Sequence, residues 1–128
     1  MSPAVPIEAV HPTQLYLSTA KLDGVLEWFD PEDPNYDPLP AFRHEGEWRF
    51  GDGHTRAFVA GLVGADRFQI ERAPVREDHD FTVYRAAIEW CREAGIETIA
   101  DLHGRLVGPE AYERLWVDRC RRVTGDAA

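Results

Sequence analysis

The chain contains no apolar run that approaches the roughly 20 residues needed to cross a bilayer. Its first six residues have neither the basic segment nor the apolar segment of a secretory signal. We therefore expect a cytoplasmic protein with no membrane partner. With 128 residues, 44% of them hydrophobic and 29% charged, the chain has the size and balance of a single domain that buries its own core.

Cysteine is scarce, and the two cysteines, Cys91 and Cys120, stand alone. Without a C-x-x-C pair, the sequence lacks the usual spacing of a structural zinc site. Both cysteines fall in segments with helical periodicity. We expect reduced thiols, mostly buried, because a cytosolic protein rarely keeps a disulfide.

Basic residues are fewer than acidic ones: 14 Lys and Arg against 23 Asp and Glu give a net charge of −9. A protein this acidic repels a polyanion at long range, which argues against a nucleic-acid partner. The one cluster of cations, residues 119–122, ends a predicted helix. Cations there complement the helix dipole.

Apolar periodicity and turn residues predict an α+β domain. The predicted strands are residues 5–10, 39–43, 48–50 and 67–71, with the middle two forming a hairpin. Helices are predicted after Ser18, after Gly53, and over 81–94, 97–103 and 109–123. We treat residues 1–128 as one domain, with a core over 5–72 and a helical C-terminal extension over 79–123.

An acidic, proline-rich loop over residues 30–38 follows the first predicted helix, which must end at Asp30-Pro31. This loop is either a surface connection or a lid. The C-terminal helices carry large aromatic anchors expected to pack them together or onto the sheet. These anchors are Tyr84, Trp90, Tyr112 and Trp116.

The segment Gly51-Asp52-Gly53-His54-Thr55-Arg56 carries the most chemistry. A strand runs into a glycine turn that opens a helix, whose first amides lack intrahelical partners and sit at the positive end of the dipole. Glycines let the backbone approach a ligand closely. An imidazole, a hydroxyl and a guanidinium follow, and all three can donate to phosphate oxygens. The segment therefore predicts an anion-binding helix N-terminus.

Two familiar phosphate motifs do not fit this segment. There is no G-x-x-x-x-G-K-[ST], and Arg56 stands where a dinucleotide fingerprint has its third glycine. A simpler alternative stays open, in which the segment is only a hairpin-to-helix turn with His54 buried and Arg56 exposed.

Residues 52–56 before an alanine-rich helix resemble the D-G-H-x-R signature of the ParB-like and sulfiredoxin-like superfamily. The layout of residues 5–72, including His11-Pro12, is similar as well. The resemblance implies a small mixed sheet with packed helices that binds nucleotide phosphates at this helix N-terminus. Members include chromosome-partition CTPases, free-serine kinases that use ADP or ATP, and sulfinic-acid reductases.

The sequence of residues 52–56 differs from the motifs of some members of the superfamily, which reduces the number of activities that the resemblance implies. The reductases have a cysteine where this chain has His54, and the partition proteins have G-E-R-R over residues 53–56 followed by a basic DNA-binding domain. Free-serine kinases have a pattern similar to D-G-H-H-R, in which Thr55 replaces the second histidine. The resemblance thus implies phosphoryl transfer from ADP or ATP, with CTP as another candidate, to a small hydroxyl compound such as free serine.

Roles follow from this resemblance. Gly51 and Gly53 shape the turn, while His54, Thr55 and Arg56 hold phosphate oxygens together with the amides of residues 53 and 54. Asp52 binds Mg²⁺, orients His54, or serves only as a turn residue. For the general base the resemblance points to an acid near the start of the domain, and Glu8 comes before Glu27.

Further alternatives stay open. His11 either lines the same cleft or only ends a strand. Residues 77–80 (Glu-Asp-His-Asp) either bind a divalent metal or form the polar start of a helix capped by Asp80. The whole chain is either a kinase-like enzyme, a non-catalytic nucleotide sensor or protein-interaction module, or a ParB-like nuclease or DNA-associated protein. A homodimer is compatible with each of these.

Overall fold

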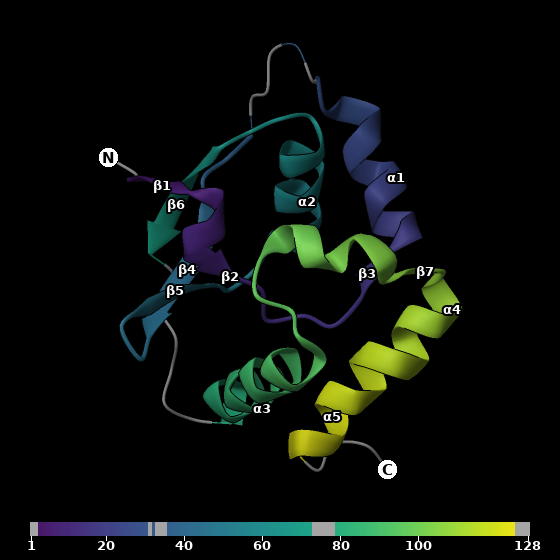
Figure 1. Ribbon diagram of the computed structural model, residues 1–128. Helices are drawn as coiled ribbons and strands as arrows, with labels where there is room; N and C mark the ends of the chain where they lie inside the picture. Colours follow the sequence, from purple (N-terminus) through teal and green to yellow (C-terminus); the bar gives the residue numbers. More distant parts are fainter. Residues whose placement is uncertain (1–2, 31, 33–35, 73–78, 125–128) are drawn as a thin grey trace.

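A computed structural model describes residues 3–30, 32, 36–72 and 79–124, without the side chains of residues 79–81 and 124. Within these residues the chain has the mixed α+β composition expected from the sequence (Figure 1). The strands are β1 (Ala4–Pro6), β2 (Val10–His11), β3 (Leu17–Ser18), β4 (Leu39–His44), β5 (Glu47–Phe50), β6 (Arg67–Arg72) and β7 (Leu106–Val107). The α-helices are α1 (Thr19–Trp28), α2 (His54–Leu62), α3 (His79–Ala94), α4 (Pro109–Tyr112) and α5 (Asp118–Thr124). Two 3₁₀-helices, η1 (Ile7–Ala9) and η2 (Ile99–Gly104), and a π-helical turn, η3 (Glu113–Val117), complete the order.

The main sheet is mixed and has the strand order β1-β6-β4-β5-β2. Strand β6 is antiparallel to β1 and parallel to β4, while β5 is antiparallel to β4 and parallel to β2. Strands β3 and β7 form a separate parallel pair that joins the N-terminal and C-terminal parts of the chain.

The hairpin β4–β5 shows which helices cover which face of the sheet. Ala41 pairs with Phe50, and Phe42 pairs with Arg49, so the two pairs point to opposite faces. The Phe50 ring lies 5.2 Å from the ring of His54 in α2, which places α2 on one face. The Phe42 ring lies 5.0 Å from that of Tyr84 in α3, which places α3 on the other. The turn after β5 therefore lies where elements of both faces meet.

One hydrophobic cluster unites the N-terminal and C-terminal parts of the chain. The large side chains Phe50, Phe68 and Ile70 of the sheet are wholly buried in it. Ile99 and Leu102 of η2 and Trp116 of η3 belong to the same cluster. The C-terminal third therefore packs into the core of the domain. Trp90 and Trp116 contribute by packing edge to face, 5.9 Å apart, as expected of aromatic anchors.

The elements differ from the sequence expectation in four places, one of them the helix predicted over 109–123, which the π-helical turn η3 divides into α4 and α5. The strand predicted over residues 5–10 is split by η1, because β1 ends at Pro6, which has no amide to continue a ladder. Strands β3 and β7 were not predicted, since each has two residues and pairs only with its distant partner. The helix predicted over 97–103 is the 3₁₀-helix η2, capped by the reciprocal Thr98–Asp101 hydrogen bonds.

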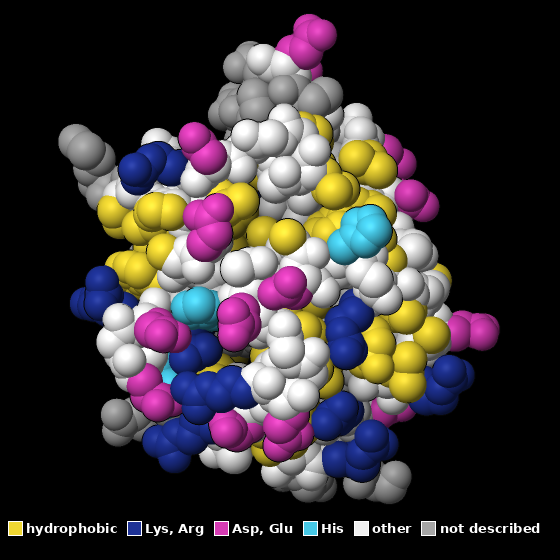
Figure 2. Space-filling model, viewed as in Figure 1, with side chains coloured by type: hydrophobic (Ala, Val, Ile, Leu, Met, Phe, Trp, Pro, Cys, Tyr) yellow, Lys and Arg dark blue, Asp and Glu magenta, His cyan; other side chains and the backbone are white. Residues whose placement is uncertain are grey.

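The hairpin, α1, α2 and β6 were confirmed within a residue or two. Among the described helices, none has the length and apolar composition to span a membrane. Acidic and basic side chains are interspersed on the face shown in Figure 2, particularly in its lower half.

Candidate functional site

The turn between β5 and α2 requires glycine at residue 53. Gly53 has φ +80° and is the N-cap of α2, a left-handed conformation that residues with a Cβ resist. A Cβ there would lie 2.9 Å from Nη2 of Arg56 and 3.0 Å from Cδ2 of Leu39. Gly53 is therefore needed for its conformation and for the close approach of the Arg56 guanidinium.

Arg56 folds back from the first turn of α2 over Gly53. Its side chain is half-buried, yet the guanidinium makes no hydrogen bond or ion pair with any residue that the structure describes. Its positive charge acts on Tyr36, where it opposes the rise in the hydroxyl pKa that burial causes. An unpaired cation thus lies against the start of a helix.

The N-terminus of α2 has no side-chain cap within the described chain. The Gly53 amide is occupied, because it donates to Oδ1 of Asp52 at 2.8 Å. The first amide bonded inside the helix is that of Ala57, which donates to the Gly53 carbonyl at 3.0 Å. The amides of residues 54–56 precede it and have no intrahelical acceptor, and they lie at the end where the dipole of this nine-residue helix is positive.

The imidazole of His54 is held inside the protein, with only 3% of its surface exposed. The Thr13 amide donates to Nε2 at 2.9 Å, so this nitrogen is the acceptor and Nδ1 carries the proton of the neutral ring. Burial lowers the pKa of His54 to about 3, against a weaker upward effect of Asp52. The burial of His54 agrees with the simpler alternative for this segment, a hairpin-to-helix turn with a buried histidine. A contact between the His54 ring and phosphate stays a prediction.

His54 also has one unsatisfied donor. Its Nδ1 is buried and has no hydrogen-bond partner among the described residues. Buried donors are nearly always paired, and an unpaired one costs about 1–3 kcal/mol. His54 lines a small pocket, so both His54 and Arg56 bring a donor without a partner among the described residues to this turn.

That pocket, of about 190 Å³, lies beside the turn. Its walls come from the turn, from the segment around Thr13, from α3 and from the C-terminal helices. Tyr84 of α3 donates its hydroxyl hydrogen to the Gly51 carbonyl at 2.7 Å, and Thr13 donates its own to the Phe50 carbonyl at 2.7 Å. These bonds fix the backbone on both sides of Gly51. The pocket is smaller than a whole nucleotide, and none of the described Lys and Arg residues, Arg56 included, is part of its lining.

The other predicted site residues are spread over the surface. Asp52 is exposed and acts in the turn, while Thr55 is half-buried in the first turn of α2. Glu8 in η1 and Glu27 in α1 are exposed. His11 bonds elsewhere, to Glu97 and Glu47. None of the carboxylates named here lines the pocket beside the turn.

Asp52 is the carboxylate that the sequence analysis assigned to Mg²⁺. The described residues include no group of three His, Cys, Asp or Glu that could hold a metal ion. Magnesium is often held by one carboxylate together with substrate phosphates, so Asp52 fits an ion that arrives with a nucleotide. Of the alternative metal cluster, Glu77 and Asp78 lie outside the described residues.

Sequence reasoning did not foresee the contacts that Thr13, Tyr36 and Tyr84 make at the site. Thr13 and Tyr84 act on the turn from positions 41 and 33 residues away in the chain, a relationship that no local pattern encodes. Tyr36 lies in the 30–38 loop, of which residues 31 and 33–35 are outside the described chain. Its ring stacks on Phe29 at 5.9 Å, which brings the end of this loop toward Arg56.

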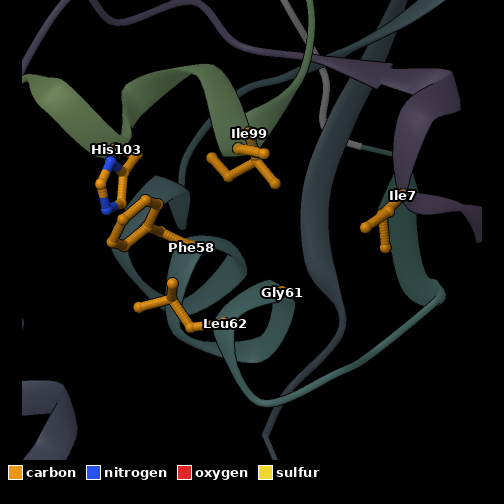
Figure 3. A pocket seen from close by; sticks show the side chains of 7 residues that line it. Ile7, Phe58, Gly61, Leu62, Ile99 and His103 are labelled. Carbon is orange, nitrogen blue, oxygen red and sulfur yellow. The ribbon is translucent and has the colours of Figure 1, made fainter.

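A second pocket, of about 220 Å³, has an apolar lining (Figure 3). It lies between α2, η2 and η1, and its only titratable side chain is His103. Its walls include Ile7, Phe58, Leu62 and Ile99. With no cation and no free helix N-terminus in its lining, this pocket has no means to bind phosphate.

Both cysteines are free, as predicted, and neither is an activated nucleophile. Burial raises the pKa of Cys91 to about 12 and that of Cys120 to about 11. In the neighbouring cation cluster, Arg119 stacks over Trp90 at 4.1 Å and Arg121 pairs with Glu113 at 3.3 Å. Two of the three arginines in this cluster therefore have structural partners.

Comparisons with protein-family models, with curated proteins and with solved structures find no match to this chain. The fold and the turn define a small mixed α+β domain in which the N-terminus of α2 has no side-chain cap among the described residues.

Proposed function

We propose that residues 51–56 bind a phosphate group of a nucleotide. The observation that supports this most is the guanidinium of Arg56, which lies over Gly53 without a partner in the described chain and beside an uncapped helix N-terminus. A half-buried cation is costly unless a counter-charge is present for part of the time. A phosphate would supply that charge and accept from the free amides at once.

Each group of the turn has a distinct part in this binding. The planar guanidinium of Arg56 donates two parallel hydrogen bonds to phosphate oxygens, and the amides of His54 and Thr55 donate to a third. The Thr55 side chain adds a hydroxyl in the first turn of α2. His54 acts as a positioning residue, because its buried ring joins α2 to the Thr13 segment.

Phosphoryl transfer to a small hydroxyl compound such as free serine is the reaction that we propose on the resemblance to free-serine kinases. Asp52 would then hold Mg²⁺ and Glu8 would accept the hydroxyl proton, while Arg56 would neutralise charge on the transferred group. The geometry supports the binding step, and transfer rests on the motif.

A non-catalytic nucleotide sensor is the second candidate, and one observation favours it. No carboxylate lines the described pocket beside the turn, and His54 is neutral with its Nε2 already occupied. The described site thus has donors for a phosphate but no base in contact with it.

Thermal unfolding with ADP, ATP and CTP, each with Mg²⁺, tests the binding proposal. A nucleotide at a hundred times its Kd stabilises the folded state by about 2.7 kcal/mol, which raises Tm by several degrees at this size. We expect this rise with one nucleotide and its loss in Arg56→Ala. Arg67→Ala is the matched control, because Arg67 is an exposed arginine at the start of β6, beyond the other end of α2.

No rise with any nucleotide at millimolar concentration would overturn the proposal. If one nucleotide binds, incubation with free serine separates the two candidates. Phosphoserine formed by the wild type and lost in Glu8→Gln, with nucleotide binding unchanged, supports transfer. Binding without any product supports the sensor.

A further inference from the structure

A third pocket, of about 430 Å³, lies between one end of the main sheet and the C-terminal half of α3. It shares no lining residue with the pocket beside the 51–56 turn. Its polar walls come from β2, β5, α3 and the segment that follows α3. The charged and titratable residues among them are His11, Glu47, Arg49, Cys91, Arg92 and Glu97.

Arg49 is the central feature of this pocket. The parallel register of β2 and β5 pairs it with His11, and the pleat turns it to the face covered by α3. Only 5% of its surface is exposed. One Nη atom contacts Oε2 of Glu47 at 3.3 Å, but Nε is buried and has no hydrogen-bond partner in the described chain.

An arginine buried in this way is incompletely satisfied. Burial lowers the pKa of Arg49, and the neighbouring Glu47 opposes this shift. Arginine stays protonated in proteins, so the unpaired Nε–H is a buried, charged donor on a side chain that lines an open pocket. Such donors are rare because leaving them unpaired is costly. The buried Nε–H of Arg49 lacks an acceptor oxygen among the described residues.

The remaining groups limit the charge of that acceptor. His11 is held between the Glu97 carbonyl, 2.6 Å from Nδ1, and Glu47, 3.2 Å from Nε2. Arg92 reaches outward to Glu45 at 3.1 Å and to Glu89 at 3.2 Å. Two arginines and one histidine in the lining face two glutamates, a surplus of at most one positive charge, which Glu45 and Glu89 beside Arg92 reduce further. This balance fits a monoanion better than a dianionic phosphate.

We propose that this pocket binds a small molecule through a carboxylate, with the Arg49 Nε–H donating to one carboxylate oxygen and Arg92 lying at the pocket mouth. Guanidinium and carboxylate match in geometry, and the bond is charge-assisted. The site is separate from the nucleotide site, so the two proposals stand or fall independently.

The test follows the Arg49 Nε–Hε signal by NMR in the ¹⁵N-labelled protein at pH 7. Sodium acetate, sodium benzoate, sodium phosphate and sodium chloride are added separately at matched ionic strength, up to about 50 mM, a range that reaches weak millimolar Kd values. We expect a carboxylate to move the Arg49 signal and to saturate it. The Nε–Hε signal of Arg43 is the internal control, since Arg43 is an exposed arginine on the same hairpin that stacks over Trp48.

Two variants test whether the carboxylate response depends on Arg49. Arg49→Lys keeps the charge but removes the Nε–H, and we expect the response of the His11 and Cys91 amides to carboxylate to weaken about tenfold or more. Arg56→Ala should leave the carboxylate titration unchanged. If Arg49→Lys does not fold, the wild-type titration decides alone.

Three results would overturn the proposal. One is an Arg49 signal that does not move with any carboxylate, and another is a shift no larger than chloride produces. The third is a stronger, saturating response to phosphate, which would mean that the pocket prefers a dianion.

Discussion

The backbone amide of Thr13 donates a hydrogen bond of 2.9 Å to Nε2 of His54, which lies 41 residues further along the chain. The Thr13 hydroxyl donates to the Phe50 carbonyl, so one residue holds both the strand that precedes the turn and the helix that follows it. The bond fixes the tautomer of His54 and the direction in which α2 leaves the sheet. His54 thereby links the packing of the core to the geometry of the candidate phosphate site.

The depressed pKa of His54 predicts a specific pH dependence of stability. The folded state keeps the ring neutral down to about pH 3, whereas the unfolded chain binds a proton below its ordinary value of 6.5. This contribution to stability is complete above pH 6.5 and is lost as the pH falls toward 3. The expected slope is about 1.4 kcal/mol per pH unit in this range. Urea unfolding between pH 7 and pH 5 measures it.

His54→Gln is the control for that slope, because glutamine does not titrate. The pKa values of the carboxylates of Glu45 and Asp101 are lowered, so their contributions to stability are lost only below about pH 4.5. The slope between pH 7 and pH 5 therefore does not come from these two carboxylates. An equal slope in His54→Gln would show that other groups cause it.

Gly53→Ala should damage both the fold and the anion site. Its φ of +80° costs alanine about 1–2 kcal/mol. The new Cβ must also displace the Arg56 guanidinium or Leu39. Gly46→Ala is a close control, since Gly46 has φ +78° but no atom within 4 Å of such a Cβ. Urea unfolding and nucleotide titration of both variants separate the effect of the contact with Arg56 and Leu39 from the effect of the positive φ. If Gly53→Ala and Gly46→Ala had equal effects in both measurements, the assigned position of Arg56 would be contradicted.

Tyr84→Phe removes the hydroxyl that donates to the Gly51 carbonyl at 2.7 Å, while it keeps the ring packed on Phe42. We expect a loss of about 1 kcal/mol in the free energy of unfolding. Weaker nucleotide binding should accompany it, because the turn then loses its hydrogen bond to α3. Unchanged nucleotide affinity at reduced stability would limit Tyr84 to a structural part.

The thiols should be protected in the folded protein. Because burial raises the pKa of Cys91 to about 12 and of Cys120 to about 11, their thiolate fractions at pH 8 are about 100-fold or more below that of an ordinary cysteine. Ellman's reagent should detect two thiols quickly in urea and react slowly with the native state. Cys120→Ser identifies the remaining reaction as that of Cys91. Fast modification of the native protein would contradict the burial of both thiols.

Local chemistry made much of the fold predictable. The glycine turn between two apolar runs gave the hairpin β4–β5, and the proline after Asp30 set a limit on α1. The start of α2 was predictable from residues 51–56, because a turn and a helix N-terminus are determined within a few residues. The burial of His54 was foreseen only as one of two alternatives.

Distant contacts were not predictable from these patterns. The pairing of β3 with β7 depends on segments 89 residues apart, Leu17 against Leu106. The sequence analysis assigned nothing to Arg49, which is buried on the face of the sheet that α3 covers. The pairing with His11 depends on a parallel register that loop lengths alone do not specify.

The sequence by itself determined the α+β class, the turn and the residue types at the start of α2, because each follows from backbone preference and side-chain chemistry within a short segment. The tertiary structure decided which polar side chains are buried and which lack a partner in the described chain. It turned His54 inward to Thr13, left Arg56 without a partner among the described residues, and enclosed Arg49 beneath α3. Burial and pairing depend on which distant segments meet, and only the packed core selects them.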